Sequence, residues 1–165
     1  MSSSTPDLLT AVVLTISDSC ARGQRDDLSG PAVAQLLRAK QFAVVGSEII
    51  PDEQPAIQHA LLRWIKDARL VVTTGGTGIA PRDLTPEATR AVCPRLLDGV
   101  AERMRLEGAK QTPLAALSRG VCGISAQSLV LNLPGSPRGA VESLQAVIDL
   151  LPHALQLLAG DTHHA

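Results

Sequence analysis

A chain of 165 residues has the length of one domain, and we expect a single domain over residues 1–165 with frayed tails at 1–7 and 160–165. Apolar residues make up 45% of the chain and are almost all aliphatic, with one Phe, one Trp and no Tyr, which argues against an aromatic platform for single-stranded nucleic acid. The formal net charge of −1 excludes a broad electrostatic surface for nucleic acid or an anionic membrane.

The cysteines and the first residues indicate the compartment. Cys20, Cys93 and Cys122 are odd in number and form no C-x-x-C pair, so we expect reduced thiols and not a disulfide framework or a zinc site. The first 18 residues lack the basic region of a signal peptide, and no apolar run reaches the roughly 20 residues that span a bilayer. We therefore expect a soluble cytoplasmic protein without membrane contact.

Strand and helix signals alternate in the first half of the chain. The apolar run at 11–16 predicts a strand covered on both faces, and Ser29 with Pro31 in the first turn predicts a helix N-cap. A second strand is expected over 42–50, and Asp52 can cap the helix that follows it. That helix places four apolar residues on one face, so Trp64 is interpreted as a packing residue: Ile57, Leu61, Trp64 and Ile65.

The alternation continues to the C-terminus. Residues 70–74 predict a third strand, and Thr85 with Pro86 at the first helical position predicts the next helix start. Pro94 interrupts that helix. Further elements are expected as a helix near 97–110, a short helical turn after Pro113, two strands over 121–124 and 128–134, and a last helix over 141–155 that Pro152 kinks or breaks.

This order predicts an α/β fold, a three-layer α/β/α arrangement with a mainly parallel sheet. One antiparallel strand is expected near the C-terminal end, because the last two strands are joined too tightly for a crossover. Ligands of such folds bind outside the carboxyl ends of the strands. The polar clusters that follow predicted strands are Ser17 with Asp18, Asp52, the glycines of 75–78 and the "PGSP" at 134–137. We expect a site where they meet.

The segment "LVVTTGGTGIAPRDLTPEAT" (70–89) is the most specific part of this edge. It contains no lysine, so it is not a Walker loop, and Pro81 occupies the third position of the dinucleotide fingerprint. Gly75, Gly76 and Gly78 allow the backbone to approach a ligand closely, and their N–H groups with the Thr77 hydroxyl can line an anion-binding concavity. A tight turn without a ligand explains the glycines equally well.

The aspartates near the glycines favour a ligand that binds together with a metal ion. Asp52 and Asp83 each follow a strand end, and Asp27 lies on the loop after the first strand. Each would repel a phosphate by about 1–4 kcal/mol at 4 Å, whereas Mg²⁺ is commonly held by one or two carboxylates together with substrate phosphates. A role as helix N-cap explains Asp52 equally well. It does not explain Asp83, because Thr85 is the better cap of the helix that follows. Arg82 brings a positive charge that is coupled to Asp83.

No side-chain nucleophile is indicated. His59 and His153 fall on predicted helices, and His163 and His164 fall in the tail, where they are not expected to bind a metal. A phosphate nucleophile is already ionised, so transfer between phosphates needs mainly positioning and charge stabilisation.

Six motifs together resemble one family. They are "TISDS" (15–19), "GQRDDLSGP" (23–31), "IIPDE" (49–53), "TTGGTGIAPRDLTPEAT" (73–89), "LSRG" (117–120) and "LNLPGSPRGAVE" (131–142). In this order the chain resembles the molybdopterin adenylyltransferases, the family of MogA, MoaB and the G domains of plant and animal molybdenum-insertion proteins, from about residue 12 to 158.

The resemblance implies a reaction in which Mg-ATP and molybdopterin give adenylylated molybdopterin and pyrophosphate, ready for molybdate insertion. It also implies a homotrimer and is compatible with transient docking to a molybdenum-insertion enzyme. By motif, Asp52 and Asp83 are implied as catalytic acids acting through Mg²⁺. The other implied substrate-binding residues are Gly75, Gly76, Thr77 and Gly78 around the nucleotide phosphates, Ser118, Asn132, Pro134, Gly135, Ser136 and Pro137 as pterin-side or other substrate contacts, and Ser17, Asp18 and Asp27 in loops at the border of the pocket. Arg82 is a further candidate for binding the nucleotide or substrate.

One position departs from the pattern. Several relatives have a serine where this chain has Gly108, so a hydroxyl contact to the substrate is missing or is replaced by Lys110. Two other interpretations stay open. The first is a scaffold of the same fold that binds molybdopterin without turnover, and the second is a nucleotide-handling α/β protein with another phosphorylated substrate.

Overall fold

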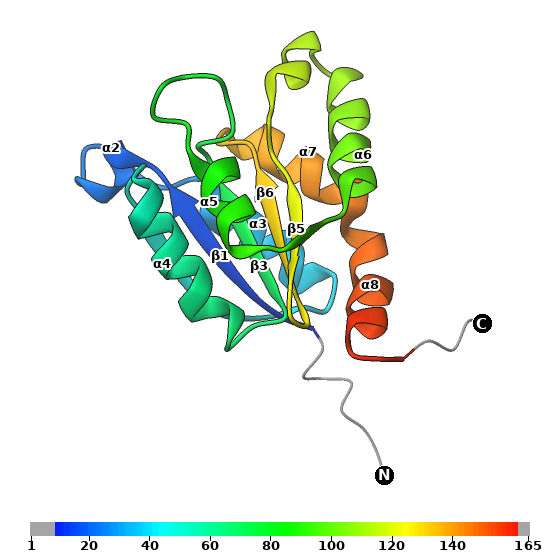
Figure 1. Cartoon of the computed structure of the whole chain (residues 1–165). Helices are drawn as coiled ribbons and strands as arrows, with labels where there is room; N and C mark the ends of the chain where they lie inside the picture. The colour runs from blue at the N-terminus through cyan, green and yellow to red at the C-terminus, as the bar shows by residue number, and fades with distance from the viewer. Residues whose placement is uncertain (1–8, 162–165) are drawn as a thin grey trace.

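The computed structural model describes residues 9–161, shown as a ribbon in Figure 1. The predicted tail at 1–7 and the last four residues of the predicted tail at 160–165, with His163 and His164, lie outside the described residues. The strands are β1 (Thr10–Ile16), β2 (Ala43–Ile50), β3 (Leu70–Thr74), β4 (Arg95–Leu96), β5 (Cys122–Ser125) and β6 (Ser128–Leu133). The helices are α2 (Asp18–Ala21), α3 (Ser29–Ala39), α4 (Gln54–Ile65), α5 (Thr85–Val92), α6 (Asp98–Ala109), α7 (Pro137–Val147) and α8 (Leu151–Leu158), with 3-10 turns η1 (Pro113–Leu117) and η2 (Ile148–Leu150).

The strands form one sheet in the order β2-β1-β3-β6-β5-β4. β1, β2, β3 and β6 are parallel, and β5 runs antiparallel to both of its neighbours. The predicted fold class is confirmed, including the antiparallel strand that the tight β5–β6 connection requires. The two-residue strand β4 was not predicted, because so short a segment carries no periodic signal.

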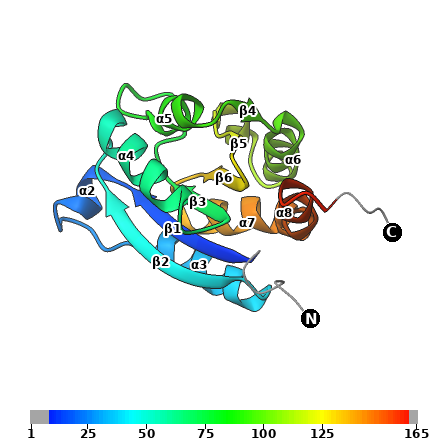
Figure 2. The same ribbon diagram turned by 60° about the horizontal axis from the view of Figure 1, so that its bottom comes forward.

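Helices cover both faces of the sheet, as Figure 2 shows along its edge. α4 and α5 pack on one face, where Val12 and Leu14 of β1 contact a core that includes Leu61. α3, α6, α7 and α8 pack on the other face, where Val13 of β1 joins a core that includes Leu144. Successive residues of β1 thus enter opposite cores, which explains the continuous apolar run of the central strands.

The edge strand β2 differs from the central strands. Its residues alternate between exposed and half-buried positions, so the prediction of a second strand is confirmed but this strand lies at the edge of the sheet. Trp64 of α4 lies against Gly46, and its indole N–H donates to Glu48 Oε1 at 2.7 Å. Trp64 is therefore a packing residue, as its helical spacing predicted.

The start of α3 corrects one prediction. Ser29 is the first helical residue and does not cap the helix. Its hydroxyl lies 2.9 Å from the Thr74 hydroxyl at the end of β3, and Asp27 Oδ1 accepts the N–H of Gly30 at 3.0 Å. The local sequence favoured Ser29 as the cap, but a partner from β3 engages its hydroxyl and leaves the Gly30 N–H to Asp27.

The C-terminal helices follow the prediction closely. α7, η2 and α8 succeed one another, so the long apolar pattern is broken into three segments, and Pro152 lies in the first turn of α8, where its missing N–H is tolerated. Within residues 9–161, no helix is long and apolar enough to cross a membrane.

Candidate active site

The carboxyl ends of the parallel strands face the top of Figure 1, where the loops after β1, β2, β3 and β6 gather. In the sheet β1 lies between β2 and β3. The chain therefore adds β2 on one side of β1 and then crosses over to add β3 on its other side. Such a topological switch point opens a crevice at the carboxyl edge of an α/β sheet.

Two cavities open along this edge. The carboxylate cavity has a volume of about 340 Å³ and is lined mainly by loop residues: Thr15, Ile16, Ser17, Cys20, Arg25, Asp26, Asp27, Leu28, Ser29, Asp52, Thr74, Gly75, Gly76, Asp83, Gly135, Ser136 and Pro137. The apolar cavity has a volume of about 530 Å³ and extends to α6 and η1; its walls include Ala101, Met104, Arg105, Gly108, Leu114, Ala115, Leu117, Ser118, Gly120, Asn132 and Pro134. Gly76, Asp83, Gly135 and Ser136 line both, so the cavities adjoin.

The structure brings the predicted site residues together. All of them line one cavity or the other except Asp18 and Arg82, which lie beside the carboxylate cavity and contact Asp52 and Asp18 respectively. The roles implied for these residues remain predictions. Their convergence on one edge of the sheet is an observation.

The loop between β3 and α5, residues 75–84, is here called the glycine loop. Gly75 and Gly76 have φ angles of 92° and 69°, which residues with a side chain rarely adopt. A Cβ on Gly75 would collide with the Ile16 carbonyl, and one on Gly76 would collide with the Thr85 hydroxyl. Thr85 is not the predicted N-cap, because its hydroxyl is buried and donates to the Gly75 carbonyl at 3.0 Å. The two glycines are thus required by the loop itself.

The glycine loop presents backbone donors to both cavities. The N–H groups of Gly76, Thr77 and Gly78 donate to no other residue within 9–161. At the border shared by the two cavities, here called the rim, Ser136 caps α7 by accepting the N–H of Gly139 at 3.0 Å. Free N–H groups and the N-terminus of an eleven-residue helix both favour an anion at this rim.

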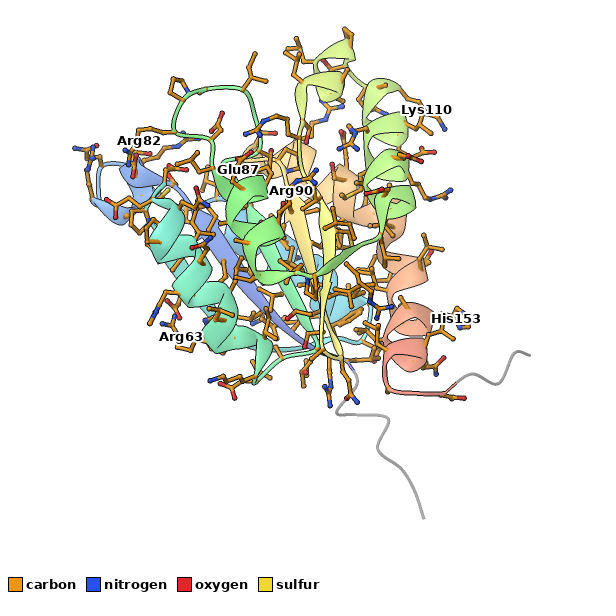
Figure 3. All side chains as sticks on the ribbon, in the orientation of Figure 1. Arg63, Arg82, Glu87, Arg90, Lys110 and His153 are labelled. Atoms are coloured by element: carbon orange, nitrogen blue, oxygen red, sulfur yellow. The ribbon has the colours of Figure 1, made fainter. Side chains whose placement is uncertain are left out.

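The carboxylates of the loops after β1 and β2 form a reciprocal pair with the backbone. Asp52 Oδ2 accepts the N–H of Asp18, and Asp18 Oδ1 accepts the N–H of Asp52, each at 2.9 Å. Asp52 is therefore not the predicted cap of α4, which has no side-chain cap. Arg82 lies beside α2 in Figure 3 and donates to both Asp18 oxygens, at 2.7 and 3.1 Å. Its partner is Asp18, not the adjacent Asp83.

The electrostatic balance of this cluster is negative. Burial raises the pKa of Asp52, and the charges of Asp18 and Asp83 raise it further, against the lowering effects of the Asp18 N–H and Arg82. Hydrogen bonds from Arg82 lower the pKa of Asp18. Arg82 pairs with Asp18, and neither Asp52 nor Asp83 forms an ion pair within residues 9–161, so a phosphate entering here needs an accompanying cation.

Asp52 and Asp83 each keep one carboxylate oxygen available to such a cation. Asp83 Oδ2 accepts the N–H of Ala80 at 3.0 Å, so this residue also closes the turn of its own loop. Asp83 Oδ1 and Asp52 Oδ1 accept no hydrogen bond from residues 9–161. Across those residues no group of three or more His, Cys, Asp or Glu side chains could hold a metal ion, so a metal must take most of its ligands from a substrate or water.

Other polar residues of the cavities are occupied by the protein. Asn132 accepts the N–H of Val121 at 3.1 Å and donates to the hydroxyls of Thr73 and Thr89 at 3.1 and 3.0 Å. Asp27 accepts the Thr15 hydroxyl at 2.7 Å, besides its bond to α3. These two side chains stabilise the base of the site through hydrogen bonds within the protein.

The comparison with protein families decides the relationship. A family model described as a probable molybdopterin binding domain matches residues 12–153. The chain belongs to this family.

Individual relatives agree. A molybdopterin adenylyltransferase of Helicobacter pylori strain J99 is 42% identical over 156 residues, covering 90% of this chain and 87% of that protein. The molybdenum cofactor synthesis protein cinnamon of Drosophila melanogaster is 47% identical over 158 residues, covering 93% of this chain but 26% of the fly protein. The molybdopterin biosynthesis enzyme MoaB of Thermus thermophilus, known from a crystal structure, is 49% identical, with a TM-score of 0.87 over 92% of this chain and 97% of that one.

Relative to the family pattern, the position of Gly108 has a structural explanation. A Cβ at this position would lie 2.9 Å from the Ala115 Cβ of η1, so the glycine allows α6 and η1 to pack closely beside the apolar cavity. Lys110 does not replace the missing hydroxyl, because it pairs with Glu107 at 3.0 Å and does not line the cavity. In Figure 3 it lies at the end of α6.

Sequence reasoning missed three arginines of this member of the family, of which Arg25 lines the carboxylate cavity. Arg105 of α6 lines the apolar cavity and donates to the carbonyls of Ser118 and Gly120. Arg119, next to the predicted Ser118, contacts the glycine loop. A helical Arg is typically a surface residue, and only the "LSRG" motif could have drawn attention to Arg119.

Proposed function

We propose that this member of the molybdopterin-binding family is a molybdopterin adenylyltransferase of molybdenum cofactor biosynthesis. It transfers the adenylyl group of Mg-ATP to the terminal phosphate of molybdopterin and releases pyrophosphate. The names of relatives that match most of the chain support the reaction. The observation that carries it here is the pair of adjoining cavities, one polar with carboxylates and one apolar, which meet at the glycine loop.

The two cavities suit the two substrates differently. The carboxylate cavity and the rim offer free N–H groups and open carboxylate oxygens, which fit a triphosphate with its cation. The apolar cavity offers Met104, Leu114 and Ala115 as walls and Ser118 as a polar contact, which fits a flat heterocycle. We assign the pterin to the apolar cavity and the phosphates of ATP to the carboxylate side of the glycine loop.

The residues required by the transfer follow from this placement. The N–H groups of Gly76, Thr77 and Gly78 hold phosphate oxygens and orient the α-phosphorus toward the phosphate of molybdopterin. Asp52 and Asp83 would hold a Mg²⁺, which would supply positive charge beside the phosphates. The phosphate oxygen of molybdopterin forms the new bond to the α-phosphorus as the bridging bond to pyrophosphate breaks.

No protein nucleophile takes part in this scheme. Burial raises the pKa of Cys93 to about 11 and that of Cys122 to about 12, so both thiols are protonated at neutral pH. His59 lies on α4 and His153 on α8, and neither lines a cavity of the site. The phosphate of molybdopterin is ionised without help, so the protein has to position it and stabilise charge.

The test is pyrophosphate release from the purified protein with ATP, Mg²⁺ and molybdopterin. We expect release only when all three are present, with adenylylated molybdopterin as the second product in equal amount. Binding of molybdopterin without any release of pyrophosphate would show instead a scaffold that has kept the fold and lost the reaction.

A further inference from the structure

The glycine loop is held by an arginine that lies outside it. Arg119, between η1 and β5, donates Nε to the Gly78 carbonyl at 2.7 Å and Nη2 to the Asp83 carbonyl at 2.6 Å. Its backbone N–H donates to the Thr77 carbonyl at 2.7 Å. One residue therefore fixes both ends of the segment that carries the phosphate-binding N–H groups and Asp83.

The same guanidinium is tied to helix α5. Nη1 donates to Glu87 Oε2 at 2.6 Å and Nη2 to Glu87 Oε1 at 3.3 Å. Hydrogen bonds from Arg119 lower the pKa of Glu87, and the pair is 38% and 40% exposed. All three guanidinium nitrogens are thus engaged in a planar fork, which a lysine cannot reproduce.

Arg119 reaches the site only through the loop. Its neighbours Ser118 and Gly120 line the apolar cavity, but Arg119 lines neither cavity. Its contacts to Gly78 and Asp83 are to carbonyl oxygens, on the backbone of residues whose other atoms face the cavities. It can influence a substrate by placing the loop, not by touching the substrate.

Besides Arg119, few contacts hold the middle of the loop. Ile79 at its tip is 70% exposed, and the turn is closed by two hydrogen bonds between Ala80 and Asp83, at 2.9 and 3.0 Å. A further contact is the ion pair of Arg82 with Asp18, in which the Arg82 side chain is 57% exposed. Segments with few buried contacts and exposed backbone open at low free-energy cost. The loop would then spend less time in the geometry that transfer requires, and the observed rate would fall in proportion.

We infer that Arg119 is a positioning residue for the adenylyl transfer, which sets the place of Asp83 and of the loop N–H groups from behind the site. The Glu87 ion pair holds the guanidinium flat against the two carbonyls. This inference rests on the proposed function and adds to it a residue that contacts no substrate.

The test compares Arg119→Ala with Arg63→Ala. Arg63 is a matched control because it also pairs with a glutamate, Glu48, and the pair is similarly exposed, at 45% and 32%. Figure 3 shows Arg63 on α4, toward the end of the molecule opposite to Glu87. We expect kcat of Arg119→Ala to fall about a hundredfold, as for a misplacement of about 1 Å, with the affinity for molybdopterin unchanged, and we expect Arg63→Ala to keep wild-type kcat.

Two further variants separate positioning from general damage. Guanidinium ion added to Arg119→Ala should restore part of kcat, and it should restore none in Asp83→Asn. Glu87→Gln keeps both carbonyl contacts and should lose less activity than Arg119→Ala. Should Arg119→Ala not fold, Arg119→Lys replaces it, with the same expected order. Equal kcat for the Arg119 and Arg63 variants would overturn the inference.

A readout without turnover keeps this inference distinct from the proposed function. Amide hydrogen exchange of residues 77–84 should be faster in Arg119→Ala than in the wild type and in Arg63→Ala, whether or not the protein releases pyrophosphate. Absence of pyrophosphate release from the wild type would contradict the proposed function alone. Unchanged exchange of residues 77–84 would contradict the positioning role of Arg119.

Discussion

The two cavities of the site are built in different ways. The carboxylate cavity is formed largely by loops at the carboxyl ends of the parallel strands, and its key groups are backbone N–H groups and aspartates. The apolar cavity is formed by side chains of α6 and η1 against the end of β6, and its walls are mainly apolar. The first therefore depends on charge and backbone conformation, and the second on helix packing, so substitutions should affect the two substrates separately.

The largest expected effect belongs to Asp83, the carboxylate that lines both cavities. Asp83→Asn keeps an oxygen for the Ala80 N–H but removes a charge that holds the cation, so turnover should fall by about 10²–10³-fold with folding intact. Steady-state pyrophosphate release at saturating Mg-ATP measures this. Equal turnover of the variant and the wild type would remove Asp83 from the mechanism.

Asp52→Asn should separate activity from stability. Because burial raises the pKa of Asp52 in the folded protein, the folded state keeps this proton to a higher pH than the unfolded chain does. Its contribution to stability is therefore lost as the pH rises through the folded pKa, and the uncharged Asn avoids that loss.

We expect Asp52→Asn, without Mg²⁺, to melt at or above the wild-type temperature at neutral pH, with the difference vanishing below the ordinary carboxyl range. Its turnover should nevertheless be strongly reduced. Thermal melts across a pH range and steady-state turnover measure these effects, and a lower melting temperature at neutral pH would contradict the assigned electrostatics.

Ser118→Ala tests the apolar cavity alone. Loss of one hydrogen bond to the pterin should raise KM for molybdopterin about tenfold, and KM for Mg-ATP should stay as in the wild type. Kinetics with each substrate varied in turn measure the split. A change confined to the KM of ATP would reverse the assignment of the two cavities.

The smallest effect uses Cys20 as a reporter of the carboxylate cavity. This half-buried thiol lines that cavity, whereas Cys93 and Cys122 are buried with raised pKa values. A thiol reagent at mildly alkaline pH should modify Cys20 first, and Mg-ATP at ten times its dissociation constant should slow the reaction about tenfold. Mass spectrometry identifies the modified cysteine. Protection by molybdopterin alone would contradict the proposed placement of the two substrates in separate cavities.

The features that sequence predicted well are those that local pattern determines. The buried runs of β1, β3 and β6 and the tight connection to β6 were enough for the mixed sheet, and the carboxyl-end rule then placed the polar clusters on one edge. The glycine loop lines the cavities on that edge, and the family match over residues 12–153 includes the loop.

The wrong predictions share one cause. Ser29, Asp52 and Thr85 each carry a side chain suited to an N-cap, but each instead contacts a residue far away in the sequence or in the glycine loop. Arg119 was missed for the same reason, since the partners of its side chain are 32 to 41 residues distant. Local preference for a cap or a surface position gives way where tertiary contacts offer a better partner.

The most direct test of the central claim is calorimetric titration of the protein with ATP, with Mg²⁺ and then with excess chelator. If the aspartates recruit the cation that lets a lysine-free loop hold a triphosphate, removal of Mg²⁺ should weaken binding at least about tenfold, and the combined Asp52→Asn and Asp83→Asn variant should lose most of that dependence. Equal affinity for ATP with and without Mg²⁺ in the wild type would contradict it.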